Sequence, residues 1–246
     1  MVNRKAITPQ QVQNNFTLLS WWLALSLIPF AKYLVVYLCN RTSISPNQIT
    51  AASFCFRILT AACFLTGSSK GFIIGGGCFY LACLLDAVDG PVARLTGQMS
   101  PFGRYFDHLS DLFGDIVILI CLAISQGLLF TPMVLGLAFM HLAESYISYL
   151  TNLALDNRKN VNFNSSFFNS HFLFKAYKQY RDFFFQRNLK SFLSYPDYCF
   201  LAFIVFPLLN KPAMGLFVGF YVILIIVLYT IFSTFVTLHS GKRLFP

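Results

Sequence analysis

Long apolar runs, separated by short polar breaks, occupy most of the chain. The longer runs lie at about 48–66, 72–97, 103–126, 131–155 and 212–238, and a shorter one lies at about 196–210. A helix needs about 20 mainly apolar residues to cross a bilayer. This pattern therefore predicts an all-α integral membrane protein with about six transmembrane helices.

The first part of the chain, residues 1–44, is expected to stand apart from a transmembrane domain at 45–246. Residues 1–15 are polar and predict a mobile start. Residues 16–39 are apolar and could span the membrane. Pro29 and Lys32, past the middle of that run, favour instead an amphipathic helix lying along the membrane surface.

The composition agrees with a membrane protein. Hydrophobic residues make up 57% of the chain and charged residues only 11%, with a mean hydropathy of +0.63. A soluble domain usually carries about twice that charged fraction. The seven cysteines form no CxxC pair and lie mostly in apolar runs, so neither disulfides nor zinc are expected.

The net charge of +9 indicates contact with anionic lipid and not with nucleic acid. Many of the cations fall within residues 156–194, where aromatic side chains interleave with them. Such a stretch is typical of an amphipathic segment on an anionic membrane surface. The same charges could also hold a phosphorylated substrate.

Five of the nine acidic residues are concentrated between positions 86 and 115: Asp86, Asp89, Asp107, Asp111 and Asp115. Carboxylates with strongly apolar flanks are costly to bury unless they are paired or metal-bound. The first two are three residues apart and the next two are four apart, so each pair shares a helix face. Residues 97–103 suit a turn that would bring the two pairs together.

Oxygen ligands of this kind suit Mg²⁺, Mn²⁺ or Ca²⁺ and do not suit zinc. Two such ions sharing one site could clamp a pyrophosphate for in-line displacement. Intramembrane acids also occur in the ion pathways of transporters, so the cluster alone leaves both classes open.

Eight residues at fixed spacing resemble the signature of class I of the CDP-alcohol phosphotransferase (CDP-alcohol phosphatidyltransferase) family: Asp86-x2-Asp89-Gly90-x2-Ala93-Arg94-x8-Gly103-x3-Asp107-x3-Asp111. The resemblance is dense from about residue 45 to 115. It implies transfer of a substituted phosphoryl group from a CDP-alcohol to a second alcohol, with release of CMP. Family members commonly carry a juxtamembrane amphipathic helix before the first span, which favours that interpretation of residues 16–39.

The resemblance also implies a role for each acid of the signature. Asp86, Asp89, Asp107 and Asp111 would hold two ions, Mg²⁺ or Mn²⁺. Asp111 would in addition be the catalytic base on the acceptor hydroxyl, and its spacing of one turn from Asp107 permits this. Gly103 would allow a tight approach at the start of its helix.

Five further residues are nucleotide-binding candidates through the resemblance: Gly90, Ala93, Arg94, Asn47 and Thr50. The first two have minimal side chains, against which a nucleotide could lie, and the arginine would contact phosphate. The last two belong to a Pro-Asn-x-x-Thr element that the family often shows here. The same Ser-Pro-Asn sequence is also a plain helix start.

Two more charged residues are supporting candidates. Arg57 lies inside an apolar span, where a cation needs a carboxylate or a phosphate as partner. Structural pairing and substrate contact are both open for it. Asp115 adds another acid one turn after Asp111.

The two substrates are not fixed by the signature. The family includes enzymes that use CDP-diacylglycerol with soluble acceptors such as glycerol phosphate, serine or inositol phosphate. We favour CDP-diacylglycerol and, mildly, a polyol phosphate: inositol-using members often show an acid like Asp115, but many also carry Arg where this chain has Leu112. The alternatives are transfer from CDP-choline or CDP-ethanolamine to diacylglycerol, or a non-enzymatic metal-dependent transporter.

The basic residues predict an orientation. With six spans and both termini cytoplasmic, two cations fall outside, Lys70 and Lys211, and fifteen fall inside: Arg4, Lys5, Lys32, Arg41, Arg94, Arg104, seven within 156–194, Lys242 and Arg243. This strong positive-inside bias puts the active site on the cytoplasmic face. A bacterial inner membrane is the expected location. The expected partners are membrane lipid, the two substrates and a second copy of the chain in a homodimer.

Overall fold

A computed structural model describes residues 6–16, 18–157 and 172–239. Regular structure within these ranges is helical, apart from an isolated β-bridge between Leu19 and Leu189, which confirms the all-α expectation. The terminal cations of the orientation count and residues 158–171 of the basic stretch lie outside the described residues.

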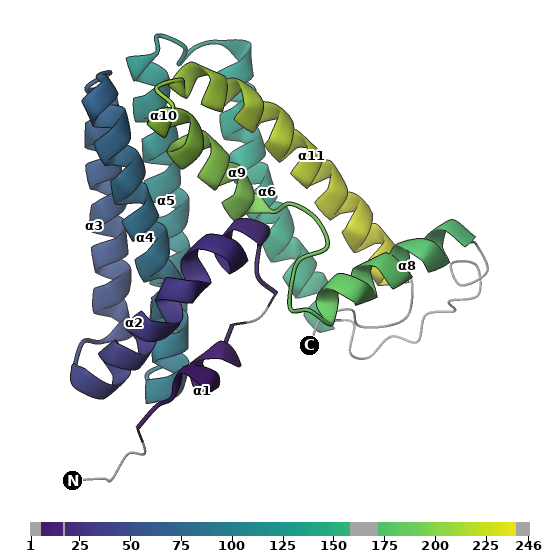
Figure 1. Ribbon diagram of the computed structural model, residues 1–246. Helices are drawn as coiled ribbons and strands as arrows, with labels where there is room; N and C mark the ends of the chain where they lie inside the picture. The colour runs from purple at the N-terminus through teal and green to yellow at the C-terminus, as the bar shows by residue number, and fades with distance from the viewer. Residues whose placement is uncertain (1–5, 17, 158–171, 240–246) are drawn as a thin grey trace.

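Three long helices stand side by side: α3 (Pro46–Leu65), α4 (Ser69–Thr96) and α5 (Pro101–Ser125) (Figure 1). The second and third of them carry the acidic signature. Their close approach depends on small residues. A Cβ atom on Gly75 of α4 would lie 2.5 Å from the ring of Phe64 on α3, so only glycine fits there.

The chain reverses sharply between α4 and α5, as the turn residues predict. Gly97 has a left-handed backbone (φ 71°) that ends α4. The Ser100 hydroxyl then accepts the Gly103 N–H at 2.9 Å and begins α5 with Pro101 as its first residue. This tight reversal places the carboxylates of α4 opposite those of α5.

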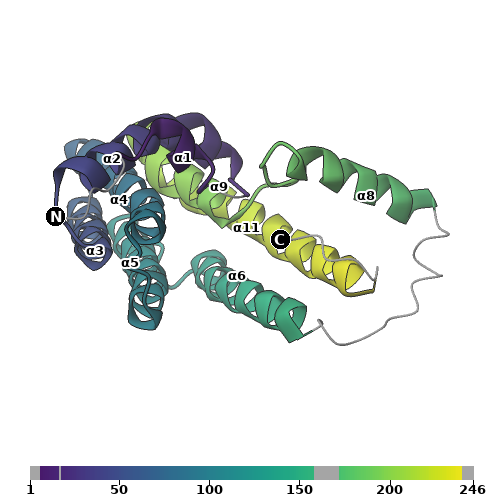
Figure 2. The same cartoon turned by 90° about the horizontal axis from the view of Figure 1, so that it is seen from below.

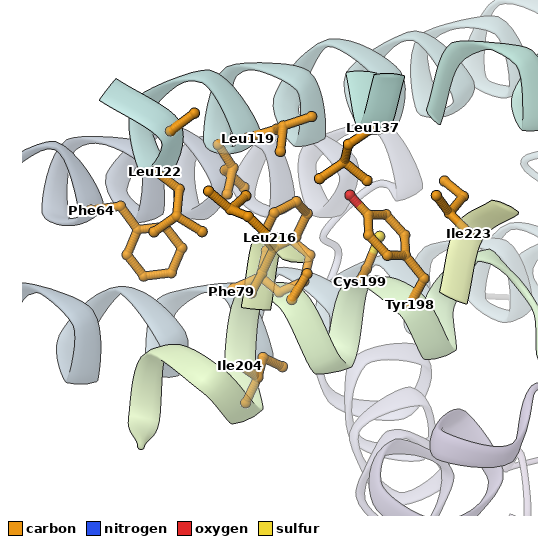
Figure 3. Packing of buried hydrophobic residues seen from close by; sticks show 14 of the residues in the cluster. Phe64, Phe79, Leu119, Leu122, Leu137, Tyr198, Cys199, Ile204, Leu216 and Ile223 are labelled. Carbon is orange, nitrogen blue, oxygen red and sulfur yellow. The ribbon is translucent and has the colours of Figure 1, made fainter. Parts of the chain in front are cut away.

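The second half of the chain packs against these helices through an apolar core. It consists of α6 (Pro132–Asn157), α8 (Phe172–Phe185), α9 (Tyr195–Phe200), a π-helical turn (Leu201–Val205), α10 (Phe206–Leu208) and α11 (Pro212–His239). In Figure 3 Phe79 and Leu119 of the first half meet Leu137, Tyr198 and Leu216 of the second.

Six of the described helices are long and apolar enough to cross a membrane, the number expected from the sequence. One member of the set differs from the predicted list. Leu23–Arg41 is included, whereas the segment predicted at 196–210 forms the shorter apolar stretch Tyr195–Leu208. The π-helical turn interrupts that stretch.

The described part of the N-terminal segment, residues 6–16, is ordered, contrary to the expected mobile start. Thr8 begins α1 (Pro9–Gln13) with a capping box, and Val12 is fully buried. The Ile7 N–H donates to Asn40 of α2 (Ile28–Arg41) at 2.9 Å. The polar composition of this segment gave no indication of α1, a short helix that packs on α2 and buries the single apolar side chain of Val12.

The amphipathic α8 lies beside α11, at the end of the molecule that also holds α1 and the α4–α5 turn (Figures 1 and 2). Arg181 of α8 donates to the Ser233 hydroxyl of α11 at 3.2 Å, and the hydroxyl of Tyr177 donates to that of Tyr229 at 3.3 Å. The described helix of the basic stretch, α8, is thus brought to the same end as the acidic signature.

Candidate metal and nucleotide site

Three signature carboxylates converge between α4 and α5. Asp86, Asp89 and Asp107 each offer an oxygen, and these atoms all lie within 4.8 Å of one another. Asp89 is 6% exposed, and its Oδ2 lies 2.5 Å from the hydroxyl of Thr50 on α3. The α4–α5 reversal and one hydrogen bond from α3 therefore hold the three acids in a single cluster.

A divalent cation fits this cluster. Like charges so close together repel one another, and hard carboxylate oxygens are the ligands that Mg²⁺ and Mn²⁺ prefer. Two buried oxygens at this place, Asp86 Oδ1 and Asp111 Oδ1, make no hydrogen bond within the described part of the chain. Both face Nη2 of Arg57, at 3.8 and 2.7 Å, and a metal ion would supply further positive charge to this group of acids.

Asp111 lies apart from the three-acid group and against a protein cation. Its Oδ1 is 2.7 Å from Nη2 of Arg57, an ion pair whose geometry is not that of a hydrogen bond. The same guanidinium is 3.8 Å from Asp86 and donates through Nη1 to Ser53 at 2.6 Å. Of the two open roles for Arg57, the structure thus gives it carboxylate pairing.

The approach of Arg57 to α5 depends on a glycine. A Cβ atom on Gly114 would lie 2.5 Å from Cδ of Arg57. Arg57 itself is only 3% exposed, so a larger residue at position 114 would displace a closely packed side chain. The small residue between Asp111 and Asp115 is therefore what lets the cation reach both acids.

Asp115 connects this cation to the second half of the chain. Its Oδ1 accepts from Arg57 Nε at 3.0 Å, and its Oδ2 accepts from the Tyr195 hydroxyl of α9 at 2.9 Å. The same hydroxyl lies 2.6 Å from Nε2 of His141 on α6. A buried polar chain thus runs from α3 through α5 and α9 to α6.

All five nucleotide-binding candidates line one cavity of about 170 Å³. Its walls come from the start of α3, the end of α4 and the start of α5. Asp89, Asp107 and Gly103 also line it, so the cavity adjoins the carboxylate cluster. A Cβ atom on Gly103 would lie 2.8 Å from the side-chain oxygen of Asn47, which gives the tight approach expected there.

Arg94 is exposed at the rim of this cavity and donates to the backbone carbonyl of Asn15 at 3.0 Å. Thr50 was expected to contact the nucleotide, and the structure gives it a further contact with Asp89. It is 4% exposed, and its hydroxyl is engaged with Asp89, so it orients a carboxylate as well as lining the cavity.

A second, larger cavity of about 350 Å³ opens at the same end of the molecule. It lies between α6, α8, α11 and the segment that leads into α9. Arg181 and Lys190 line it together with the carboxylates of Glu144 and Asp182 and several hydroxyl groups. Ser194 borders it too and is the residue next to Tyr195, so this cavity lies close to the polar chain.

Sequence reasoning missed Tyr195, Ser53 and Gly114. Two of these left a signal: Ser53 precedes Arg57 by one helical turn, and Gly114 lies directly before Asp115. Tyr195 left none, because its partners lie 80 and 54 positions away in the chain. Pairing at that separation is set by the tertiary fold.

Known proteins resemble this chain over the same region. A family model described as CDP-alcohol phosphatidyltransferase matches residues 43–238. The CDP-diacylglycerol–inositol 3-phosphatidyltransferase of Drosophila melanogaster is 39% identical over 78 residues, 32% of this chain and 33% of that protein. The archaetidylinositol phosphate synthase of Pyrococcus horikoshii is 36% identical over 83 residues, 33% of this chain and 42% of that protein.

A third relative has a different kind of name. Cholinephosphotransferase 1 of Gallus gallus is 30% identical over 94 residues, 34% of this chain and 28% of that protein. The chain thus spans less than half the length of each of these three curated relatives. Two of the three names contain inositol, and the third contains choline.

Proposed function

The chain belongs to the CDP-alcohol phosphatidyltransferase family, and from this membership we propose that it transfers a substituted phosphoryl group from a CDP-alcohol to an alcohol acceptor and releases CMP. The observation that carries the proposal is the cluster of Asp86, Asp89 and Asp107 beside a cavity lined by the signature glycine, alanine and arginine. The process served is phospholipid synthesis in a membrane.

The metal ions, Mg²⁺ or Mn²⁺ and two in number, would be held by Asp86, Asp89, Asp107 and Asp111. When bound, they would polarise the pyrophosphate of the donor and offset the charge that develops on it. The donor's nucleotide lies along α4 at Gly90 and Ala93, with Asn47 and Thr50 at the opposite wall. Arg94 contacts phosphate as a charge-assisted donor.

Asp111 is the proposed general base. It takes the proton from the acceptor hydroxyl as the new bond to phosphorus forms, and CMP leaves. Arg57 holds the Asp111 carboxylate in place through its Oδ1, from the side of α3. A base must lie within hydrogen-bond reach of the proton that it removes, so fixing its position contributes to the rate.

The larger cavity is the proposed acceptor site, and a polyol phosphate is the acceptor that suits it. Arg181 and Lys190 offer cations for a phosphate, while Glu144 and Asp182 offer oxygens that accept hydroxyl protons. Two relatives whose names contain inositol support this choice. CDP-diacylglycerol, named in the first of them, is the proposed donor.

The proposed orientation places this end of the molecule, with both termini, at the cytoplasmic face. The support is the distribution of cations, fifteen against two in the sequence. A second candidate function, transfer from CDP-choline to diacylglycerol, is favoured by the relative named cholinephosphotransferase.

The test is acceptor-dependent release of CMP from purified protein. Labelled CDP-diacylglycerol and Mg²⁺ or Mn²⁺ would be supplied with glycerol phosphate, inositol phosphate or serine in turn. We expect CMP with a polyol phosphate and none with Asp111→Asn protein. CMP formed only from CDP-choline and diacylglycerol would select the second candidate, and no CMP from any pair would refute the enzymatic function.

A further inference from the structure

A chain of buried polar groups joins the signature helices to the second half of the molecule. Arg57 donates to Asp115 at 3.0 Å, the Tyr195 hydroxyl lies 2.9 Å from the other oxygen of Asp115, and His141 lies 2.6 Å from that hydroxyl. Arg57, Asp115 and His141 are 3%, 2% and 0% exposed. Groups so deeply buried have no water to replace a lost partner.

From His141 to Asp115, the hydrogen bonds of this polar chain run in one direction from donor to acceptor. The carboxylate of Asp115 can only accept, so the Tyr195 hydroxyl donates its single proton to it. That hydroxyl must then accept from His141, which fixes the proton of the neutral imidazole on Nε2. Removing the Tyr195 oxygen would leave Nε2 of His141 without its partner. Oδ2 of Asp115 would keep only the thiol of Cys199, whose Sγ lies 3.8 Å away.

The other end of this polar chain, at Arg57, lies against Asp111, the proposed base. Arg57 divides its donors between Asp115 through Nε, Ser53 through Nη1 and Asp111 through Nη2. An Asp115 that has lost the Tyr195 proton is short of one donor and attracts the guanidinium more strongly. Arg57 can then approach Asp115 only by leaving its place against Asp111.

We propose that Tyr195 is a positioning residue for the transfer reaction, held by His141 and acting through Asp115 and Arg57 on Asp111. This inference rests on the proposed function, because it assigns a role within that reaction. The active centre is therefore completed by α9 and α6, which lie outside the signature segment. Tyr195 touches neither substrate in this role and changes the rate of the step and not donor binding.

The test compares two tyrosines of the same helix. Tyr195→Phe removes the hydroxyl of the chain. Tyr198→Phe removes a fully buried hydroxyl that makes no hydrogen bond among the described residues, and so is a matched control. With both substrates and metal saturating, we expect kcat of Tyr195→Phe to fall about 10-fold or more. Its KM for the CDP-alcohol stays within about twofold, and Tyr198→Phe keeps the kcat of the unmodified protein.

A second pair of variants tests the histidine end. The amide of His141→Gln can still donate to Tyr195, whereas His141→Leu fills a similar volume with no donor. We expect the glutamine variant to keep most of the activity and the leucine variant to lose it as Tyr195→Phe does. All rates are referred to folded protein, measured as the monodisperse fraction in detergent, and this pair decides the question if Tyr195→Phe does not fold.

The two proposals fail in different ways. An unmodified protein without CMP release refutes the proposed function. An active unmodified protein, together with Tyr195→Phe or His141→Leu at the unmodified kcat, refutes the positioning role and leaves the function standing. A variant that lowers only the yield of folded protein, with kcat per folded molecule unchanged, also refutes it, since the hydroxyl would then serve stability alone.

Discussion

Arg57 and Asp111 meet at 2.7 Å across the interface between α3 and α5. Arg57 is almost fully buried, and the same cation lies 3.8 Å from Asp86 of the metal cluster. A single side chain thus restrains the proposed base and faces a proposed metal ligand. The arrangement ties α3, which carries no signature acid, to the chemistry of α4 and α5.

Replacing Arg57 by lysine tests this restraint. The ammonium keeps the charge, but it cannot reproduce the planar fork that reaches Ser53, Asp111 and Asp115 together. We expect kcat for CMP release to fall about 100-fold, since a base displaced by about 1 Å loses that order of rate. Arg41→Lys, at the exposed end of α2, should match the unmodified protein. An Arg57→Lys protein with normal kcat would contradict the restraint.

Gly114→Ala is predicted to disturb the contact between Arg57 and Asp111 by a steric clash. The added methyl would lie 2.5 Å from Cδ and 3.1 Å from Cβ of Arg57, so the arginine must withdraw from α5. We expect activity to fall about 10-fold or more because the Arg57–Asp111 contact opens. The matched control is Gly77→Ala, whose methyl meets no atom within 4 Å. Equal activity in the two variants would show that Arg57 adjusts without loss.

Local features of the fold were predictable where short-range chemistry sets them. The Gly97 turn, the Ser-Pro starts of α3 and α5 and the facing of the acid pairs all follow from residues a few positions apart. The signature likewise located the smaller cavity, since six of its eight residues line the walls formed by α4 and α5. Each of these depends on helix period and capping, which a single sequence displays.

Long-range pairings were not predictable in the same way. Periodicity locates the face of α3 that Arg57 occupies but not which of five nearby acids it meets. The partner of Asp115 on α9 is set by how two halves of the chain dock through their apolar core. Length and hydropathy place Leu23–Arg41 among the helices that could cross a membrane and leave out the shorter Tyr195–Leu208, but neither quantity fixes how a helix lies relative to the membrane.

Lys190→Met is predicted to weaken acceptor binding. Lys190 lines the larger cavity, and methionine keeps the length of the side chain while removing the charge that would hold a phosphate. We expect the KM for the polyol phosphate to rise about 10-fold, with the KM for the CDP-alcohol unchanged. Lys175→Met, on an exposed position of α8 outside the cavity lining, serves as the control. A rise in both KM values would place Lys190 elsewhere in the mechanism.

Metal binding can be followed without turnover, through thermal unfolding in detergent. A ligand that binds only the folded state stabilises it by about 2.7 kcal/mol at a hundred times its Kd. Mn²⁺ should therefore raise the Tm of the unmodified protein, and EDTA should reverse the rise. Asp107→Asn should lose this response, because it removes one of the three converging carboxylates. Asp182→Asn, outside that cluster, should keep it.

Without metal, Asp107→Asn should have the opposite effect and raise the Tm. Asp86, Asp89 and Asp107 repel one another in a partly buried site, so removing one charge relieves repulsion in the folded state. Metal-free Asp107→Asn should then unfold at a higher temperature than the metal-free unmodified protein, and the order should reverse when Mn²⁺ is added. Repulsion between ligands accounts for this crossover, whereas a cluster with a purely structural role would be destabilised by the substitution in both conditions. A lower Tm for Asp107→Asn with and without Mn²⁺ would therefore exclude these three carboxylates as a metal site.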